Sequence, residues 1–247
     1  MAISTNPLAW LRSVQPRRAI ALLLLLLPLT VGAQTVRDLW LSMPPSLAPY
    51  LNTSLRTQCL DFYDMHTDAQ TDNALKGKSR IDTLTSTFLA ATLSKAHTLQ
   101  MKLLPASGSG SASASGSASG LGSSMVSGSG SSSSLSSCDS VLCMVRSWDG
   151  PKRDSEVQLF DRQWKPLQAP LTFSADSFVC RPDTMSEERF SRLVAMLDPI
   201  MFSVSLSPAE NVLLVKLSPV VPNPDDEKAI EQILVQRKLK WDGKTFK

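Results

Sequence analysis

The chain has 247 residues, of which 43% are hydrophobic and 19% charged, and its formal net charge is +3. The first 33 residues hold three of the 25 basic residues and none of the 22 acidic ones, so the rest carries 22 of each sign. This balance argues against nucleic-acid binding and against a polybasic membrane patch, because both need an excess of Lys and Arg.

Residues 1–33 have the three regions of a secretory signal peptide. A basic stretch with three arginines leads into an apolar run over residues 19–30, and small residues follow up to Ala33. We therefore predict export with cleavage before Gln34. An uncleaved anchor is the alternative, but an apolar run of about 12 residues is too short to cross ~30 Å of hydrocarbon. The residue directly after the cleavage point is Gln34 and not the cysteine that a lipoprotein needs, so we expect a periplasmic or secreted protein with no stable membrane anchor.

Two helices are predicted at the start of the mature chain, and a strand is predicted at residues 88–93. The first helix ends at the two prolines 44–45, and the second begins at a cap formed by Asn52 or Thr53. The predicted apolar faces consist of Val36, Leu39, Trp40 and Met43 in the first helix and of Leu55, Cys59, Phe62 and Tyr63 in the second.

Residues 106–137 consist almost entirely of Ser, Gly and Ala. Such a segment buries too little apolar area to offset its ordering entropy, so we expect a disordered coil. The flanking residues 99–103 and 141–145 have the pattern of strands. Because the entropy of closing a loop grows only with the logarithm of its length, we predict an expanded hairpin loop inside one domain, residues 34–247. A linker between two domains is the alternative.

The C-terminal part contains several local signals. Val157 and Leu159 begin a predicted strand, which turns near Asp161 and returns through Trp164. A capping box over residues 184–187 predicts a helix that Pro199 ends. The predicted apolar face of this helix consists of Phe190, Leu193, Val194 and Leu197.

The last elements are a strand pair, a helix and a closing strand. Residues 200–206 alternate as a strand, and residues 212–217 return. Asn223 as cap, with a proline and acidic residues after it, predicts a helix start. Residues 239–241 form the closing strand before an Asp-Gly turn at 242–243. Since neighbouring strands are mainly joined by turns, we predict an α+β fold, with an antiparallel sheet and helices packed on one face.

Four cysteines belong to the mature chain: Cys59, Cys138, Cys143 and Cys180. An oxidising compartment permits disulfides, and four cysteines allow three full pairings. A bond between Cys138 and Cys143 is disfavoured, because five extended residues span roughly 16 Å, whereas bonded Cα atoms lie within about 7 Å. We expect Cys143 and Cys180 to be buried free thiols.

The densest cluster of candidate ligands follows the second predicted helix, where it could hold a divalent cation. Its members are Asp61, Asp64, His66, Asp68 and Asp72. Their spacing matches no calcium loop, so a solvated helix end is the favoured interpretation. A Cys59–His66 pair is disfavoured, because seven helical residues separate the two side chains by about 10.5 Å. The sequence nominates no catalytic, cofactor-binding or metal-binding residue.

Two tripeptides are alike, Trp-Asp-Gly at residues 148–150 and again at 241–243. They could be paired aromatic platforms for a sugar or a peptide, but a strand aromatic beside an Asp-Gly turn is the favoured interpretation. Three short triplets that begin at Asp82, Asp139 and Asp183 are candidate sites for a bacterial O-linked sugar.

Five stretches together resemble an exported family of anaerobic bacteria of the gut and mouth, the domain of unknown function 3256 family. They are TVRDLWLSMP at 35–44, PYL at 49–51, TLQMKLL at 98–104, LFDRQWKPL at 159–167 and WDGK at 241–244. The Ser/Gly-rich segment departs from the family pattern. The resemblance implies a periplasmic or secreted location and transfers no catalytic residue.

We therefore expect a non-enzymatic binding or structural protein of the bacterial envelope. Its partner would be an unknown envelope protein or glycan, with no nucleic acid and no cofactor. The alternative is a carboxylate-dependent envelope hydrolase, in which Asp61 and Asp64 are the first candidates. A third hypothesis is a scaffold in which the Ser/Gly-rich segment tethers another molecule.

Overall fold

The computed structural model describes residues 34–106, 140–221 and 223–247, and the chain from Gln34 to Lys247 forms one compact unit. The predicted signal peptide, nearly all of the Ser/Gly-rich segment, Cys138 and Asp139 lie outside the described residues. The predictions of cleavage and of a disordered loop therefore stay predictions.

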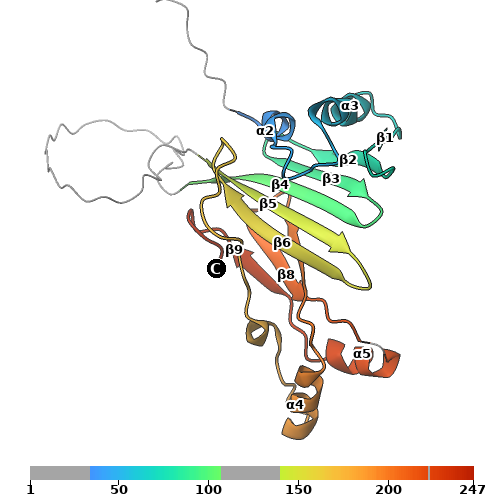
Figure 1. The fold of residues 1–247 in the computed structure, drawn as a ribbon. Helices are drawn as coiled ribbons and strands as arrows, with labels where there is room; N and C mark the ends of the chain where they lie inside the picture. Colours follow the sequence, from blue (N-terminus) through green and yellow to red (C-terminus); the bar gives the residue numbers. More distant parts are fainter. Residues whose placement is uncertain (1–33, 107–139, 222) are drawn as a thin grey trace, which may run out of the picture. The chain divides into compact units, whose positions relative to one another are not determined.

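The larger of the two sheets is antiparallel and has its strands in chain order (Figure 1). Its strands are β1 (Thr71–Asp72), β2 (Lys78–Leu84), β3 (Phe88–Ser94), β4 (His97–Pro105), β5 (Ser140–Asp149) and β6 (Arg153–Phe160). The second antiparallel sheet consists of β7 (Phe202–Leu206), β8 (Val212–Leu217) and β9 (Arg237–Lys240). The helices are α2 (Val36–Ser42), α3 (Thr53–Asp64), α4 (Glu187–Ala195), α5 (Pro224–Glu231) and the 3₁₀ helix η2 (Ala175–Phe178).

The α+β fold with antiparallel strands is therefore confirmed, but a second sheet accompanies the expected one. The reason lies in central strands that are apolar on both faces. On β5, Leu142 and Met144 are buried in the core beneath α2 and α3. Val141, Cys143 and Val145 are buried in a second core with β7 and β8. Helices on one face would leave this second apolar face in water, so the three-stranded sheet covers it.

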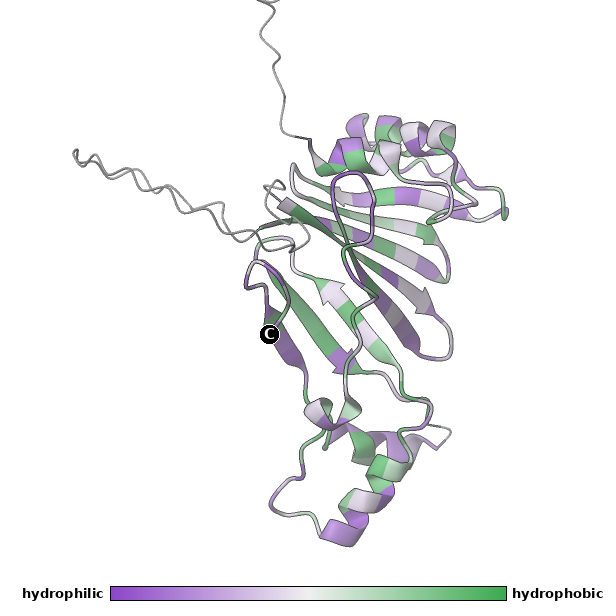
Figure 2. Cartoon of the chain, turned by 60° about the vertical axis from the view of Figure 1, so that its left-hand side comes forward, coloured by the Kyte–Doolittle hydropathy of each residue, from purple (hydrophilic) through white to green (hydrophobic). Residues whose placement is uncertain are grey.

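The two covering layers are offset across the six-stranded sheet. Helices α2 and α3 contact strands from β1 to β4, whereas β7 contacts β4, β5 and β6 from the other face (Figure 1). Hydrophobic segments accordingly occur within the strands of both sheets (Figure 2). Side chains alternate between the two faces of a strand. Arg146 and Trp148 therefore lie on the face that α2 and α3 cover in part, outside the area under these helices. Lys78 and Arg80 lie on the opposite face, outside the area that β7 covers.

The strands that flank the Ser/Gly-rich segment are paired neighbours. Antiparallel pairing of β4 with β5 runs from His97 opposite Trp148 to Pro105 opposite Ser140. The prediction that the two flanks are adjacent antiparallel strands is confirmed.

A buried lysine joins the two sheets. Lys102 is only 2% exposed, and its ammonium donates to three carbonyls of the β7–β8 turn. The distances from Nζ are 2.6 Å to Ser207 O, 3.0 Å to Pro208 O and 2.7 Å to Glu210 O. Burial lowers the pKa of Lys102, and the three carbonyl acceptors replace part of the hydration that its ammonium loses.

The outer edge of β7 is closed by side chains from the six-stranded sheet. The N–H groups of Phe202, Val204 and Leu206 do not pair with β8. They donate to Asp154 Oδ1 at 3.3 Å, Ser155 Oγ at 3.1 Å and Gln100 Oε1 at 2.8 Å, respectively. This edge therefore offers these donors to the neighbouring sheet rather than to another chain.

Two expectations about local structure are wrong, and one strand was not expected. Ser186 caps α4 through a bond from Arg189 N, so the helix starts two residues later than a cap at Thr184 requires. Cys180 is exposed rather than buried, and it lies outside the named strands and helices, directly after the isolated bridge between Val179 and Leu234. Strand β2 was not expected, since its outer face carries charged residues in place of an apolar pattern.

Candidate functional site

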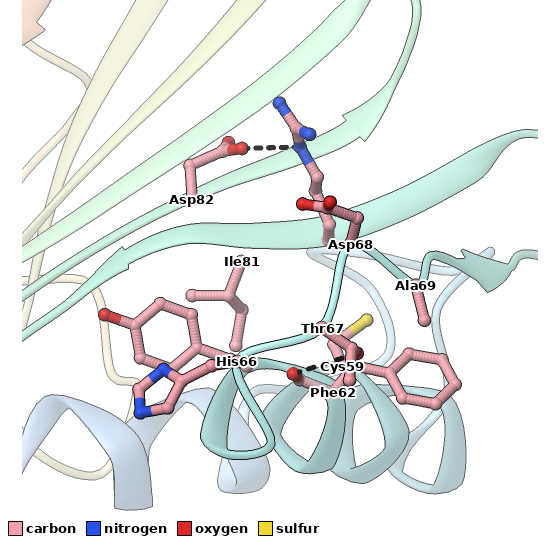
Figure 3. A pocket seen from close by; sticks show the side chains of 10 residues that line it. Cys59, Phe62, His66, Thr67, Asp68, Ala69, Ile81 and Asp82 are labelled. Carbon is pink, nitrogen blue, oxygen red and sulfur yellow. Dashed lines mark hydrogen bonds and ion pairs between the residues drawn. The ribbon is translucent and has the colours of Figure 1, made fainter.

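Some of the residues that the sequence singled out for chemistry, namely Cys59, His66, Asp68 and Asp82, line a pocket of about 310 Å³ between α3 and β2. Figure 3 shows Cys59, Phe62 and Thr67 on the α3 side and Ile81 and Asp82 on the β2 side. The full lining consists of Cys59, Phe62, Tyr63, His66, Thr67, Asp68, Ala69, Arg80, Ile81 and Asp82.

The turn after α3 shapes this pocket. Met65 N donates to Asp61 O at the helix end, and His66 takes a left-handed conformation with φ 52°. The chain therefore turns back, so that Thr67 and Asp68 face β2 across the pocket. His66 itself is exposed at this turn.

Three polar groups of this pocket, those of Cys59, Arg80 and Asp82, are bound to other protein groups. Arg80 Nε lies 2.7 Å from Asp82 Oδ1, and Thr92 donates to the other oxygen of Asp82 at 2.7 Å. The Cys59 thiol donates to Ser79 O at 3.9 Å, and burial raises its pKa. Because the thiolate is the nucleophile, this cysteine is poorly suited to attack a substrate.

The predicted acidic cluster is dispersed. Only His66 and Asp68 of its five members line the pocket. Asp64 forms an ion pair with Arg37, whose hydrogen bond lowers the pKa of Asp64, and Asp72 lies 2.6 Å from Lys78. Across the described ranges, no group of three or more His, Cys, Asp or Glu side chains is placed to hold a metal ion.

A second constellation lies where β4 begins and β5 ends. The Tyr50 hydroxyl and His97 Nδ1 form a hydrogen bond, and the His97 ring stacks on Trp148 with centroids 5.3 Å apart and an interplanar angle of 10°. Arg146 lies over the same indole, 5.7 Å from its centroid, and is paired with Glu156 at 2.6 Å. We call Tyr50, His97, Arg146, Trp148 and Glu156 the aromatic cluster.

The two titratable rings of the aromatic cluster, those of His97 and Tyr50, are uncharged near neutral pH. Burial, with a smaller contribution from Arg146, lowers the pKa of His97 to about 4, and burial raises the pKa of Tyr50 to about 12. Both rings are therefore neutral near pH 7. His97 Nε2 and Arg146 Nε are buried and have no hydrogen-bond partner within the part of the chain that the structure describes.

Trp148 remains accessible within this rigid setting, since 40% of it is exposed. Its counterpart in the second Trp-Asp-Gly tripeptide is different. Trp241 donates from Nε1 to Pro105 O at 2.7 Å and packs against Phe246 with centroids 5.0 Å apart. Trp148 lies at the end of β5 and Trp241 directly after β9, each beside its Asp-Gly turn, so the interpretation as an aromatic beside a turn holds for both, but Trp148 also presents an exposed ring.

Sequence reasoning found Trp148 but not its neighbours. Tyr50 lies 47 residues before its hydrogen-bond partner His97, and Trp148 joins them only through the pairing of β4 with β5. The sole available signal was that His97 lies two residues before the predicted strand at 99–103. Contacts of this sequence separation leave no local pattern.

The candidate sugar-attachment triplets also differ in accessibility. Ser140, which follows Asp139, is buried, and its hydroxyl accepts a hydrogen bond from Arg162 Nε at 2.9 Å. Thr184, which follows Asp183, is exposed in a loop.

Comparison with known proteins identifies the family. The family described as "Protein of unknown function (DUF3256)" matches residues 28–113 and 133–246, which is most of the chain. The chain belongs to the DUF3256 family. The resemblance seen in the five sequence stretches is thereby confirmed.

The fold of this DUF3256 chain is shared with a solved structure. A domain of an uncharacterized protein from Porphyromonas gingivalis W83 is 21% identical and has a TM-score of 0.61. The match covers 87% of this chain and 99% of the other. No match is found among curated proteins. None of the helices in the described residues is long and apolar enough to span a membrane.

Proposed function

We propose that this DUF3256 chain is an exported, non-enzymatic protein of the bacterial envelope that binds a glycan. Export is supported by the basic, apolar and small regions of residues 1–33, with cleavage near Ala33 and a periplasmic or secreted product. Binding is supported by the aromatic cluster.

The observation that carries the proposal is the open but immobilised Trp148. An exposed indole is usually free to change rotamer, whereas this one stacks on the His97 ring and lies within cation–π distance of the Arg146 guanidinium. A preorganised aromatic ring loses little conformational entropy on binding. The part of the indole that stays exposed offers an apolar surface to the C–H face of a sugar ring, while the Arg146–Glu156 pair beside it offers donors and acceptors for hydroxyl groups.

A glycan suits this surface better than a protein partner does. Protein interfaces have a desolvated core of several apolar side chains. Around Trp148 the same face of β5 and β6 carries Arg146 and Glu156 instead. The other large exposed apolar side chains of the described residues are scattered: Met65, Leu75, Leu167 and Ile200.

The two candidate carboxylates of the hydrolase alternative, Asp61 and Asp64, give it no support. A glycoside hydrolase needs one carboxylic acid with a raised pKa. The hydrogen bond from Arg37 lowers the pKa of Asp64, and neither Asp61 nor Asp64 lines the pocket beside α3.

The test is a binding titration of the purified chain with soluble peptidoglycan fragments and a panel of neutral and acidic oligosaccharides. Binding to at least one member is expected, and Trp148→Ala is expected to weaken it at least tenfold without changing the melting temperature by more than a few degrees. Ile200→Ala is the matched control, since it also removes an exposed apolar side chain. Equal affinity of the Trp148→Ala variant and the unmodified chain would overturn the proposal, as would turnover of any fragment.

Export is tested separately by the N-terminus of the protein recovered from the bacterium. A periplasmic or secreted product that begins at Gln34 is expected. A full-length product that stays with the cytoplasmic fraction would contradict it.

A further inference from the structure

A cleft of about 680 Å³ lies on the face of the six-stranded sheet that β7 leaves open, between the β1–β2 turn and the β3–β4 turn. Its wall is built by alternate residues of β2 and β3 together with both turns. The lining consists of Gln70, Leu75, Lys76, Gly77, Lys78, Arg80, Thr92, Ser94, Lys95 and Ala96.

The lining is cationic although the mature chain is balanced in charge. Four of the ten side chains are basic, and none is acidic. Asp72 neutralises Lys78 at 2.6 Å, and Asp82 neutralises Arg80 at 2.7 Å. Lys76 and Lys95 have no carboxylate within ion-pair distance among the described residues, so the cleft keeps an excess of positive charge.

The turn that carries Lys76 is held rigidly. Asn73 Oδ1 accepts from Leu75 N and Gly77 N, each at 3.0 Å, and Asn73 Nδ2 donates to Leu93 O at 2.8 Å. Lys76 itself is fixed in a left-handed conformation with φ 58°. A side chain at Gly77 would lie 3.1 Å from Asn73 Nδ2, so the turn is also tightly packed. Binding would therefore cost little backbone entropy here.

The cleft adjoins the aromatic cluster. Ala96 lines the cleft, and its carbonyl accepts from Asp149 N at 2.8 Å. Its chain neighbour His97 stacks on Trp148. The turns that follow β1, β3 and β5 all lie at the same end of this antiparallel sheet, with the cleft on one face and Trp148 on the other, so a ligand that contacts both features has to pass around this end of the sheet.

We propose that the glycan bound by this protein is acidic, with its carboxylate or phosphate groups in the basic cleft and a sugar ring on Trp148. This inference rests on the proposed function. The hydroxyl and amide groups of Thr92, Ser94 and Gln70 line the cleft beside the cations and suit saccharide hydroxyls. An anionic lipid surface fits less well, because the cations line a concavity and Leu75 is the one large exposed apolar side chain in its lining.

The probes are tetragalacturonate, which bears four carboxylates, and chitotetraose, which is neutral and of similar length. At low ionic strength the acidic probe is expected to bind at least tenfold more tightly. The preference should shrink as salt rises. It should fall at least fivefold in the double variant Lys76→Gln, Lys95→Gln. The control Lys165→Gln, Lys244→Gln removes the same charge from two exposed lysines elsewhere and should keep the preference.

Each other outcome has a defined meaning. Equal affinities for the two probes, both weakened by Trp148→Ala, would overturn the acidic ligand and leave the proposed function intact. Binding of neither probe would reject this inference. If inorganic phosphate displaced tetragalacturonate at equal concentration, the cleft would bind small anions and not specifically a glycan, and this inference would be overturned. Binding to vesicles of phosphatidylglycerol that Leu75→Ala abolishes would indicate a lipid surface and also overturn the proposal.

Discussion

Individual polar residues in this protein stabilise contacts between segments that are far apart in the chain. Lys102 holds a turn more than a hundred residues later. Tyr50 holds His97, which in turn supports the Trp148 ring. Such residues tolerate burial because each gains partners that compensate for lost hydration, and their loss leaves those partners unpaired.

Lys102→Met is expected to destabilise the fold by about 3 kcal/mol, because three carbonyls of the β7–β8 turn lose a charged donor between the sheets. Chemical denaturation measures the change. The exposed Lys165→Met serves as control and should lie within about 0.5 kcal/mol of the unmodified chain. A Lys102→Met variant as stable as the control would contradict the role assigned to this ammonium.

His97 should make stability depend on pH. Its pKa is about 4 in the folded chain, against 6.5 when unfolded, so the unfolded state binds the proton more readily. Stability is unaffected above about pH 6.5 and falls as the pH drops from 6.5 towards 4. After allowance for partial solvent exposure, we expect a loss of about 2 kcal/mol. Urea midpoints at pH 7.5 and 4.5 should show that His97→Gln loses correspondingly less, and equal losses in both proteins would refute the assignment.

At the scale of elements, local signals predicted most helices and strands, because caps and periodic apolar faces act within a few residues. Asn52 and Asn223 cap α3 and α5 as expected. Strand β2 escaped detection, because its outer residues Lys78 and Arg80 face an open cleft. The candidate site escaped for a related reason, since the contacts of Tyr50 with His97 and Trp148 exist only after the sheet has formed.

The start of α4 provides a direct test of local signal against structure. Ser186→Ala is expected to cost about 1 kcal/mol, because its hydroxyl oxygen accepts from Arg189 N at the helix start. Thr184→Ala should change stability by less than about 0.3 kcal/mol, although the capping-box pattern places the cap there. Paired thermal or urea melts measure both. A larger loss of stability in Thr184→Ala than in Ser186→Ala would show that the helix cap is at Thr184, as the capping-box pattern predicts.

At the scale of the whole molecule, the six-stranded sheet is shared by two hydrophobic cores. Met144 belongs to the core under α2 and α3, and its neighbour Val145 belongs to the core under the three-stranded sheet. Neither core can lose β5 without exposing the other. The chain from Gln34 onward should therefore unfold as one unit. We expect this even though residues 107–139 lie between the central strands β4 and β5 in the sequence.

A cut between β4 and β5 tests this unity. With a specific protease site inserted among residues 107–139, cleavage should leave the two fragments associated, because nine residue pairs join β4 to β5. The nicked protein should elute as one species and melt in one transition, at a lower temperature that depends on concentration, since unfolding now also separates two chains. Uncut protein carrying the same insertion is the control. Fragments that part without denaturant and each regain a cooperative melt would show two independent domains, because the cut separates β1 to β4 from β5 and β6 of the same sheet.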